Sequence, residues 1–148
     1  MVDRNLGQNY LTGNLCSSIS NLSHMQYLSF GIHALSRTLP KELGNLTDLI
    51  SLWAFDTKLT GRIPNFIGNW SKLTTLRLEG NSFKGPISLM FANLTSLIDL
   101  RISDLTNGSS SLEFIKDMTS LSILVLRNTS ISNSIPSNIG EYLKLSQL

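Results

Sequence analysis

The segment Leu73-Thr74-Thr75-Leu76-Arg77-Leu78-Glu79-Gly80-Asn81 decides the fold, because its pattern recurs at a constant spacing through the chain. The position of Asn81, here called the slot, recurs every 24 residues without an insertion, at Asn9, His33, Thr57, Leu105 and Thr129. Five of the six copies carry a leucine five residues before the slot, and only the first copy, with Arg4, departs from this.

Repeats of 20 to 29 residues with the pattern L-x-x-L-x-L-x-x-N are typical of a leucine-rich-repeat solenoid. We therefore expect an α/β-type solenoid, an arc of about six 24-residue rungs formed by residues 1–148 as a single segment. Short parallel strands would line the concave face, with turns and short helical or 3-10 segments on the convex face. In each strand alternate residues turn inward, so Leu76 and Leu78 would be buried while Arg77 and Glu79 face outward.

Further apolar positions are expected to complete the core of each rung. Those two places past the slot are Leu11, Leu35, Leu59, Phe83 and Ile131, and those six places past it are Leu15, Leu39, Ile63, Ile87 and Ile135.

The slot should hold an Asn whose side chain caps exposed backbone groups. His33, Thr57 and Thr129 are expected to replace it in part, whereas Leu105 has no hydrogen-bonding group. The copy around Leu105 also loses the usual turn motif, so residues 104–112 are predicted to bulge or loosen.

Composition excludes several classes of function. The net charge is only +2, from 12 basic and 10 acidic side chains scattered among the repeats, so the sequence has no cluster of basic residues for binding nucleic acid.

Cys16 is the only cysteine, and it takes the place of Pro40, Pro64 and Pro136, so we expect a buried or half-buried inert thiol. His24 and His33 lack further ligands nearby, and neither a metal nor a cofactor is expected. The longest aliphatic run, residues 123–126, is too short to span a bilayer, and we expect this segment to carry neither a signal peptide nor a membrane span.

The copies at residues 59–69 (Leu-Thr-Gly-Arg-Ile-Pro-Asn-Phe-Ile-Gly-Asn) and 131–140 resemble the plant-specific leucine-rich repeat, L-x-G-x-I-P-x-x-I-G. Residues 66–77, 100–104 and 120–128 resemble one group of plant receptor-like kinases. In that group the repeats precede a malectin-like domain, a membrane helix and a cytoplasmic Ser/Thr kinase. The resemblance implies a fragment of an ectodomain, uncapped at both ends, on the extracellular face of the plasma membrane as part of a single-pass receptor.

The chain contains six N-x-S/T sequons, which begin at Asn21, Asn45, Asn69, Asn93, Asn107 and Asn128. They predict glycosylation if the chain is secreted. A capping turn is an equal alternative, because Asn followed by an apolar residue and then Ser or Thr also suits a turn. Asn128 is the least expected acceptor, since it lies on the strand side of its slot.

The outward strand positions form columns that combine aromatic residues with charges, the composition of binding hot spots. The candidate ligand-binding residues on the concave face are Tyr27, Trp53, Phe55, Asp56, Arg77, Glu79, Arg101, Asp104 and Arg127. The alternative is an ordinary solvated face, because single exposed apolar side chains are common.

These features favour a non-catalytic recognition module, the ligand-binding or co-receptor-binding segment of a plant receptor-like kinase. Its partner would be a peptide, glycan or protein ligand, or a co-receptor ectodomain, with neither nucleic acid nor direct membrane contact. The alternatives are a secreted leucine-rich-repeat inhibitor of microbial wall-degrading enzymes and a structural spacer. A hydrolase is the weakest alternative. Asp56 and Asp104 would lie roughly 10 Å apart, a spacing that could suit inverting glycoside hydrolysis, but nothing on an open face raises the pKa of either carboxyl as a general acid requires.

Overall fold

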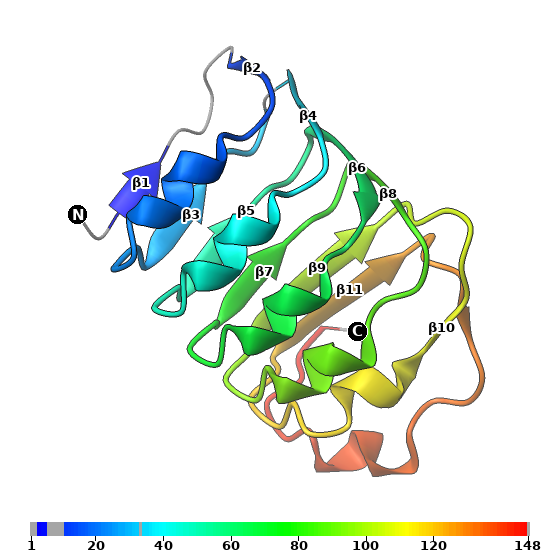
Figure 1. Ribbon diagram of the computed structural model, residues 1–148. Coiled ribbons are helices and arrows are strands. Elements are labelled where there is room, and N and C mark those ends of the chain that lie inside the picture. Colours follow the sequence, from blue (N-terminus) through cyan, green and yellow to red (C-terminus); the bar gives the residue numbers. More distant parts are fainter. Residues whose placement is uncertain (1–2, 6–10, 33, 148) are drawn as a thin grey trace.

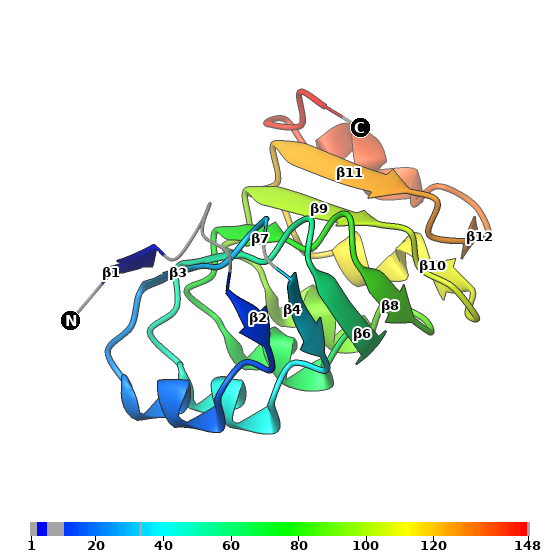
Figure 2. The same cartoon turned by 90° about the horizontal axis from the view of Figure 1, so that it is seen from above.

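The computed structural model, which describes residues 3–5, 11–32 and 34–147, winds the chain into a curved stack of coils (Figure 1). Each coil contributes a strand to one parallel sheet, a second short strand beside it, and a 3-10 helix on the opposite side (Figure 2). The two ends of the chain lie at opposite ends of the stack. The predicted solenoid is therefore confirmed.

The first sheet has six parallel strands in the order β1-β3-β5-β7-β9-β11, and coils 1 to 6 are numbered after them. Their bounds are β1 (Asp3–Asn5), β3 (Tyr27–Ser29), β5 (Ser51–Trp53), β7 (Thr75–Arg77), β9 (Asp99–Ser103) and β11 (Ile123–Arg127). Trp53 pairs with Arg77, and Arg77 pairs with Arg101, so neighbours in the sheet are 24 residues apart. This register confirms the predicted columns.

A second set of strands, which the sequence pattern suggested only as turns, runs along the side of the stack. β2 (Thr12–Gly13), β4 (Ala34–Arg37), β6 (Lys58–Arg62) and β8 (Ser82–Lys84) form a four-stranded parallel sheet. β10 (Ser110–Ser111) and β12 (Ile131–Ser132) form a separate pair.

Short 3-10 helices form the convex side, as predicted. They are η1 (Ser17–Asn21), η2 (Lys41–Asn45), η3 (Asn65–Asn69), η4 (Leu89–Asn93), η5 (Leu112–Ile115) and η6 (Ser137–Glu141). Pro40 and Pro64 precede η2 and η3 with φ near −66° and −70°, the value that the proline ring imposes. Cys16 precedes η1 in the same way, but its thiol is exposed and not buried as expected, because this position lies at the corner of the coil.

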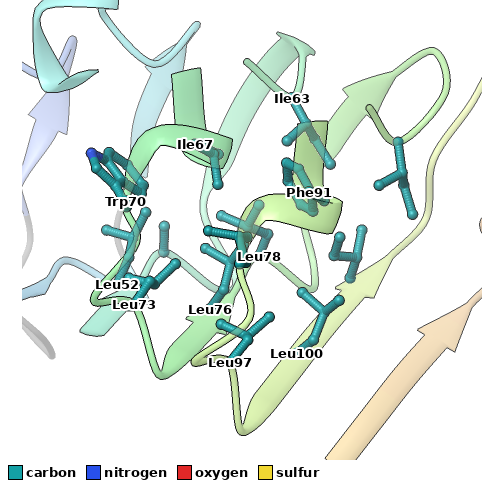
Figure 3. Packing of buried hydrophobic residues seen from close by; sticks show 14 of the residues in the cluster. Leu52, Ile63, Ile67, Trp70, Leu73, Leu76, Leu78, Phe91, Leu97 and Leu100 are labelled. Carbon is teal, nitrogen blue, oxygen red and sulfur yellow. The ribbon is translucent and has the colours of Figure 1, made fainter. Parts of the chain in front are cut away.

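The core is a continuous stack of apolar slices between the six-stranded sheet and the helices (Figure 3). Leu52, Leu76 and Leu100 are fully buried, as the sequence predicted, and the buried Trp70 joins the same core from the helical side. The expected core positions are exposed only in the end coils, as at Leu11 (41%) and Ile135 (58%). These coils have a neighbour on one side only, so the register is correct and burial fades toward the ends.

Asn81 has the predicted capping role. Its side-chain amide donates to the carbonyls of Ala54 (2.6 Å) and Leu78 (2.9 Å), and its oxygen accepts the backbone N–H of Leu59 at 3.3 Å. The hydroxyl of Thr57 also donates to Asn81 Oδ1. The slot therefore joins two consecutive coils from within the core.

The other slots differ from one another. Thr129 is 3% exposed and its hydroxyl has no hydrogen-bond partner among the described residues, so the prediction that it replaces Asn is wrong. Its side chain fits the volume of the slot but reaches no backbone group. Leu105 is buried as an apolar residue. Asn9 and His33 lie outside the described residues.

Coil 5 departs from the regular path at the predicted place, but it is not loose. Residue Lys84 pairs with Thr106, and no strand pairing continues from β8 to β10 within the described residues. Gly108 lies against the backbone of coil 4, where a Cβ would come within 2.5 Å of the Gly85 carbonyl carbon. The turn is thus a tightly packed interruption of the side sheet.

Candidate functional site

The outer face of the six-stranded sheet carries the residues that the sequence singled out. We call this surface the binding strip and define it by Tyr27, Trp53, Phe55, Asp56, Arg77, Glu79, Arg101, Asp104 and Arg127. Tyr27 and Trp53 are 43% and 40% exposed, while the intervening Leu28 and Leu52 are buried. The alternation of the strands thus presents aromatic side chains to solvent on one continuous face.

Arg77 lies at the centre of an aromatic and charged cluster. Its guanidinium carbon is 4.6 Å from the centre of the Phe55 ring and 5.8 Å from that of Trp53. Arg77 Nε and Nη2 both donate to Glu79 Oε1, at 2.9 and 2.5 Å. We call these four residues the Arg77 cluster. Because Glu79 lies on the same strand face two residues on, it holds the guanidinium against the rings before any ligand arrives.

The strip neutralises most of its own charge. Arg101 Nε donates to Asp99 Oδ1 at 2.8 Å, and this hydrogen bond raises the pKa of Arg101 above its usual value. Arg127 is different, because its side chain is 77% exposed and its Nη2 lies 3.9 Å from Asp104 Oδ2, which is beyond hydrogen-bond distance. Arg127 is therefore the strip arginine that remains most available to an anionic group.

Asp104 is held as a carboxylate by hydrogen bonds from its own coil and from coil 6. The Ser103 hydroxyl donates to its Oδ2 at 2.6 Å, and Asn128 Nδ2 donates to Oδ1 at 3.0 Å. These bonds, Ser103 first, lower the pKa of Asp104 despite some desolvation. Ser103 Oγ in turn accepts the N–H of Gly80 at 3.0 Å. A carboxyl that stays ionised is unsuited to act as a general acid, so Asp104 could not take that role in a hydrolase pair with Asp56.

A residue with left-handed backbone geometry follows each of β3, β5, β7, β9 and β11, within three residues of the end of the strand. The φ values are 62° at Ile32, 49° at Asp56, 69° at Gly80, 59° at Asp104 and 53° at Asn128. At Gly80 a Cβ would lie 2.0 Å from Asp56 Oδ1, so only glycine leaves room for that carboxylate. The column of acidic and amide side chains along this edge is therefore set by the backbone turn of the repeat.

The six sequon asparagines are all exposed. Asn21, Asn45, Asn69 and Asn93 are the last residues of η1 to η4, on the side opposite the binding strip. Within the described part of the chain their side chains make no hydrogen bond; the turn uses backbone groups instead, as in Thr47 N–H to Asn45 O at 3.0 Å. Asn128 differs, because its amide is already bound to Asp104.

The sequence did not predict that acidic and basic residues pair along the same strand. Asp99 was not among the candidate residues, although it fixes Arg101. The signal was present in the spacing, because residues two apart on a strand share a face and Arg77-Glu79 and Asp99-Arg101 both have it.

Comparisons with known proteins agree with this geometry. The family described as a leucine-rich repeat region matches residues 5–148. The leucine-rich-repeat ectodomain of the Arabidopsis thaliana membrane receptor kinase GASSHO1/SCHENGEN3, solved with CASPARIAN STRIP INTEGRITY FACTOR 2, is 30% identical with a TM-score of 0.89. That similarity covers 97% of this chain and 17% of the receptor chain.

A second similar structure is the plant peptide hormone receptor RGFR1 in complex with RGF2. It is 26% identical with a TM-score of 0.87, over 100% of this chain and 24% of the receptor chain. The chain thus spans a quarter or less of the length of either structure. None of the curated proteins matches it. In the described ranges, no helix has the length and apolar character needed to cross a membrane.

Proposed function

This chain belongs to the leucine-rich repeat region family, and on that premise we propose that it is a recognition segment of a plant receptor-like kinase ectodomain. In this proposal the binding strip binds an extracellular peptide or a co-receptor ectodomain. The leucine-rich-repeat ectodomain fold itself is non-catalytic, so the segment contributes binding and no chemistry. The similar structures with bound CASPARIAN STRIP INTEGRITY FACTOR 2 and RGF2 support a peptide as the ligand.

The Arg77 cluster is the observation that carries the proposal. Binding hot spots are enriched in Trp, Tyr and Arg, and this cluster adds Trp53 and Phe55 to a guanidinium that is held in place by Glu79. An ordinary solvated face would leave such long side chains free to move. Because the cluster is ordered in advance, a ligand loses less entropy on binding.

The charges of the strip suggest what the ligand offers. Arg77 and Arg101 already have carboxylate partners, so the central strip favours an apolar or aromatic side chain packed on Trp53 and Tyr27. Arg127, the more exposed cation, would pair with a carboxylate of the ligand. A peptide with an apolar anchor and an acidic group fits this arrangement.

The wider architecture is part of the same proposal. We infer that the segment continues into further repeats, followed by a malectin-like domain, a membrane helix and a cytoplasmic Ser/Thr kinase, with the repeats outside the cell. An apolar groove of about 230 Å³ at the end of coil 6, lined by Leu124, Leu126 and Ile135 among others, supports a further coil at that end. The exposed sequons support passage through the secretory pathway.

The test is ligand capture by the Trp53→Ala/Arg77→Ala double variant. Immobilised chain would be exposed to a panel of synthetic secreted plant peptides that includes CASPARIAN STRIP INTEGRITY FACTOR 2 and RGF2, with biolayer interferometry as the readout. A peptide that binds the native chain should lose at least tenfold in affinity in the double variant, while circular dichroism stays unchanged.

The matched control is Met90→Ala/Lys84→Ala, which also removes an exposed apolar residue and an exposed basic residue but lies off the strip. It should bind as the native chain does. Equal loss in both variants, or undiminished capture by the strip variant, would count against this placement of the ligand.

A further inference from the structure

A second surface lies at the corner of the stack, between the side sheets and the 3-10 helices. It is a groove of about 760 Å³ that crosses coils 3, 4 and 5. We call it the corner groove, and its lining includes Arg62, Phe66, Pro86, Leu89, Ser110 and Glu113. None of its lining residues belongs to the binding strip, so it is a separate surface of the molecule.

The groove exists because the side sheet is interrupted at coil 5. Beyond Gly85 no strand pairing joins coils 4 and 5 in the described part of the chain, and the N–H of Ile87 donates to the Ser110 hydroxyl at 2.9 Å instead of to a strand carbonyl. On the other side of coil 4, the stem of Arg62 lies along Gly85, where a Cβ would be 3.5 Å from Arg62 Cγ. The interruption thus leaves a hollow with an arginine along one wall.

Three serine hydroxyls give the groove hydrogen-bond donors. Ser88, Ser110 and Ser111 each accept a backbone N–H through Oγ, from Met90 (3.1 Å), Ile87 (2.9 Å) and Glu113 (3.2 Å) respectively. A serine hydroxyl has one proton of its own, and none of these three has an acceptor among the described residues. Ser110 is only 3% exposed, and the proton of its hydroxyl has no acceptor in the described part of the chain, which makes an acceptor supplied by a ligand favourable.

The groove also has an exposed apolar side chain and two opposite charges. Leu89 is 62% exposed beside the half-buried Phe66. Arg62, in coil 3, and Glu113, in coil 5, are both exposed, and neither forms an ion pair with another described residue. Two coil spacings separate them, or about 10 Å, which an extended segment in the polyproline II conformation covers in about three residues, and its threefold repeat turns the first and fourth side chains to the same face.

From these observations we propose that the corner groove binds an extended segment of a second protein. The segment carries an acidic side chain for Arg62, a basic side chain three residues away for Glu113, and an apolar side chain between them for Leu89. Its backbone carbonyls accept the protons of the serine hydroxyls. A neutral oligosaccharide would also supply acceptors, but it would leave Arg62 and Glu113 without counter-charges, so the unpaired opposite charges favour a peptide segment.

Two synthetic peptides test the proposal directly: acetyl-Glu-Ala-Leu-Lys-amide and the reversed sequence acetyl-Lys-Leu-Ala-Glu-amide. Each is titrated into the ¹⁵N-labelled 148-residue chain and followed by the amide shifts of Ile87, Met90 and Glu113. One of the two should bind at least fivefold more tightly than the other. The charge exchange Arg62→Glu/Glu113→Lys should invert that preference, because it reverses the polarity of the groove.

The controls separate this surface from the binding strip. Trp53→Ala should leave both titrations unchanged, and so should Lys84→Glu, which alters an exposed charge outside the groove. Equal binding of the two peptides, shifts confined to the strip, no shifts at all, or shifts produced only by a chitin or pectin tetrasaccharide would each overturn the proposal.

Discussion

The ring of Phe55 lies across Gly31 of the preceding coil, so close that a Cβ on Gly31 would be 2.7 Å from Phe55 Cε1. Glycine at this position therefore lets the ring lie flat on coil 2. The opposite side of the contact is Arg77, whose guanidinium carbon is 4.6 Å from the ring centre. Three consecutive coils thus fix the aromatic part of the binding strip.

Gly31→Ala should displace the Phe55 ring and weaken its contact with Arg77. A cation–π contact at an exposed site contributes about 0.5–1 kcal/mol, so we expect roughly a two- to fivefold loss of affinity for a strip ligand. The Arg77 Nε–H resonance should also lose its ring-current shift in an NMR spectrum. Gly140→Ala, where an added Cβ meets nothing within 4 Å, is the control, and an unmoved Arg77 resonance in Gly31→Ala would contradict the assignment.

Thr57 and Thr129 occupy equivalent slots and should respond oppositely to valine. Thr57→Val removes the hydroxyl that donates to Asn81 and should lower the free energy of unfolding by about 1 kcal/mol. Thr129→Val removes a buried hydroxyl without a partner among the described residues, and should raise that free energy by about 1 kcal/mol. Urea midpoints at unchanged m-value measure both. Effects of the same sign would show that the two slots are alike.

Asp104 should contribute to stability in a pH-dependent way. Its folded pKa lies below the unfolded value of about 3.9, so its stabilising effect is present above that pH and is lost as the pH falls through the folded pKa. Ser103→Ala removes the largest cause and should raise the Asp104 pKa in a carboxyl ¹³C NMR titration. Ser71→Ala, an exposed serine far along the chain, should leave it unchanged. An Asp104 pKa that is the same in Ser103→Ala as in the native chain would contradict this hydrogen-bond network.

We expect glycosylation of the sequons on the convex side of the stack and not of the sequon at Asn128 beside the binding strip. In a secretory eukaryotic host we expect glycans on exposed convex asparagines such as Asn45 and Asn69, with partial occupancy because neighbouring coils are about 5 Å apart. Asn128 should remain unmodified, since its amide binds Asp104 at 3.0 Å beside the binding strip. Peptide mapping by mass spectrometry measures each site. Full occupancy at Asn128 with empty convex sites would contradict this division.

The sequence predicted the register and the inward and outward sides of each strand, because burial repeats with the 24-residue period. Leu76 and Trp53 therefore lie where the pattern placed them. The period also names the residues that share a column, but it does not say whether their side chains meet. The Arg101–Asp99 pair depends on rotamers, and the lone hydroxyl of Thr129 depends on its distance from backbone groups.

The sequence predicted where the repeat becomes irregular better than it predicted the structure at those positions. Leu105 and the altered turn after it marked coil 5 correctly, but the sequence left a bulge and a loosening as alternatives, and in the structure Gly108 packs tightly on Gly85. Cys16 was expected to be buried as a small apolar residue, yet the corner of the coil leaves it in solvent. At Gly108 the path of the neighbouring coil decided the outcome, which the residue's own repeat does not encode.

The interrupted side sheet also bears on the mechanics of the arc. Hydrogen-bonded strands run without a break through all six coils on one side, whereas on the other side β8 and β10 are separate. At the junction of coils 4 and 5 this side is joined by the Lys84–Thr106 bridge and by the packing of Gly108 on Gly85, without paired strands among the described residues. We expect the two blocks to pivot there about the continuous sheet, so that tilting one block would widen or narrow the hollow beside it.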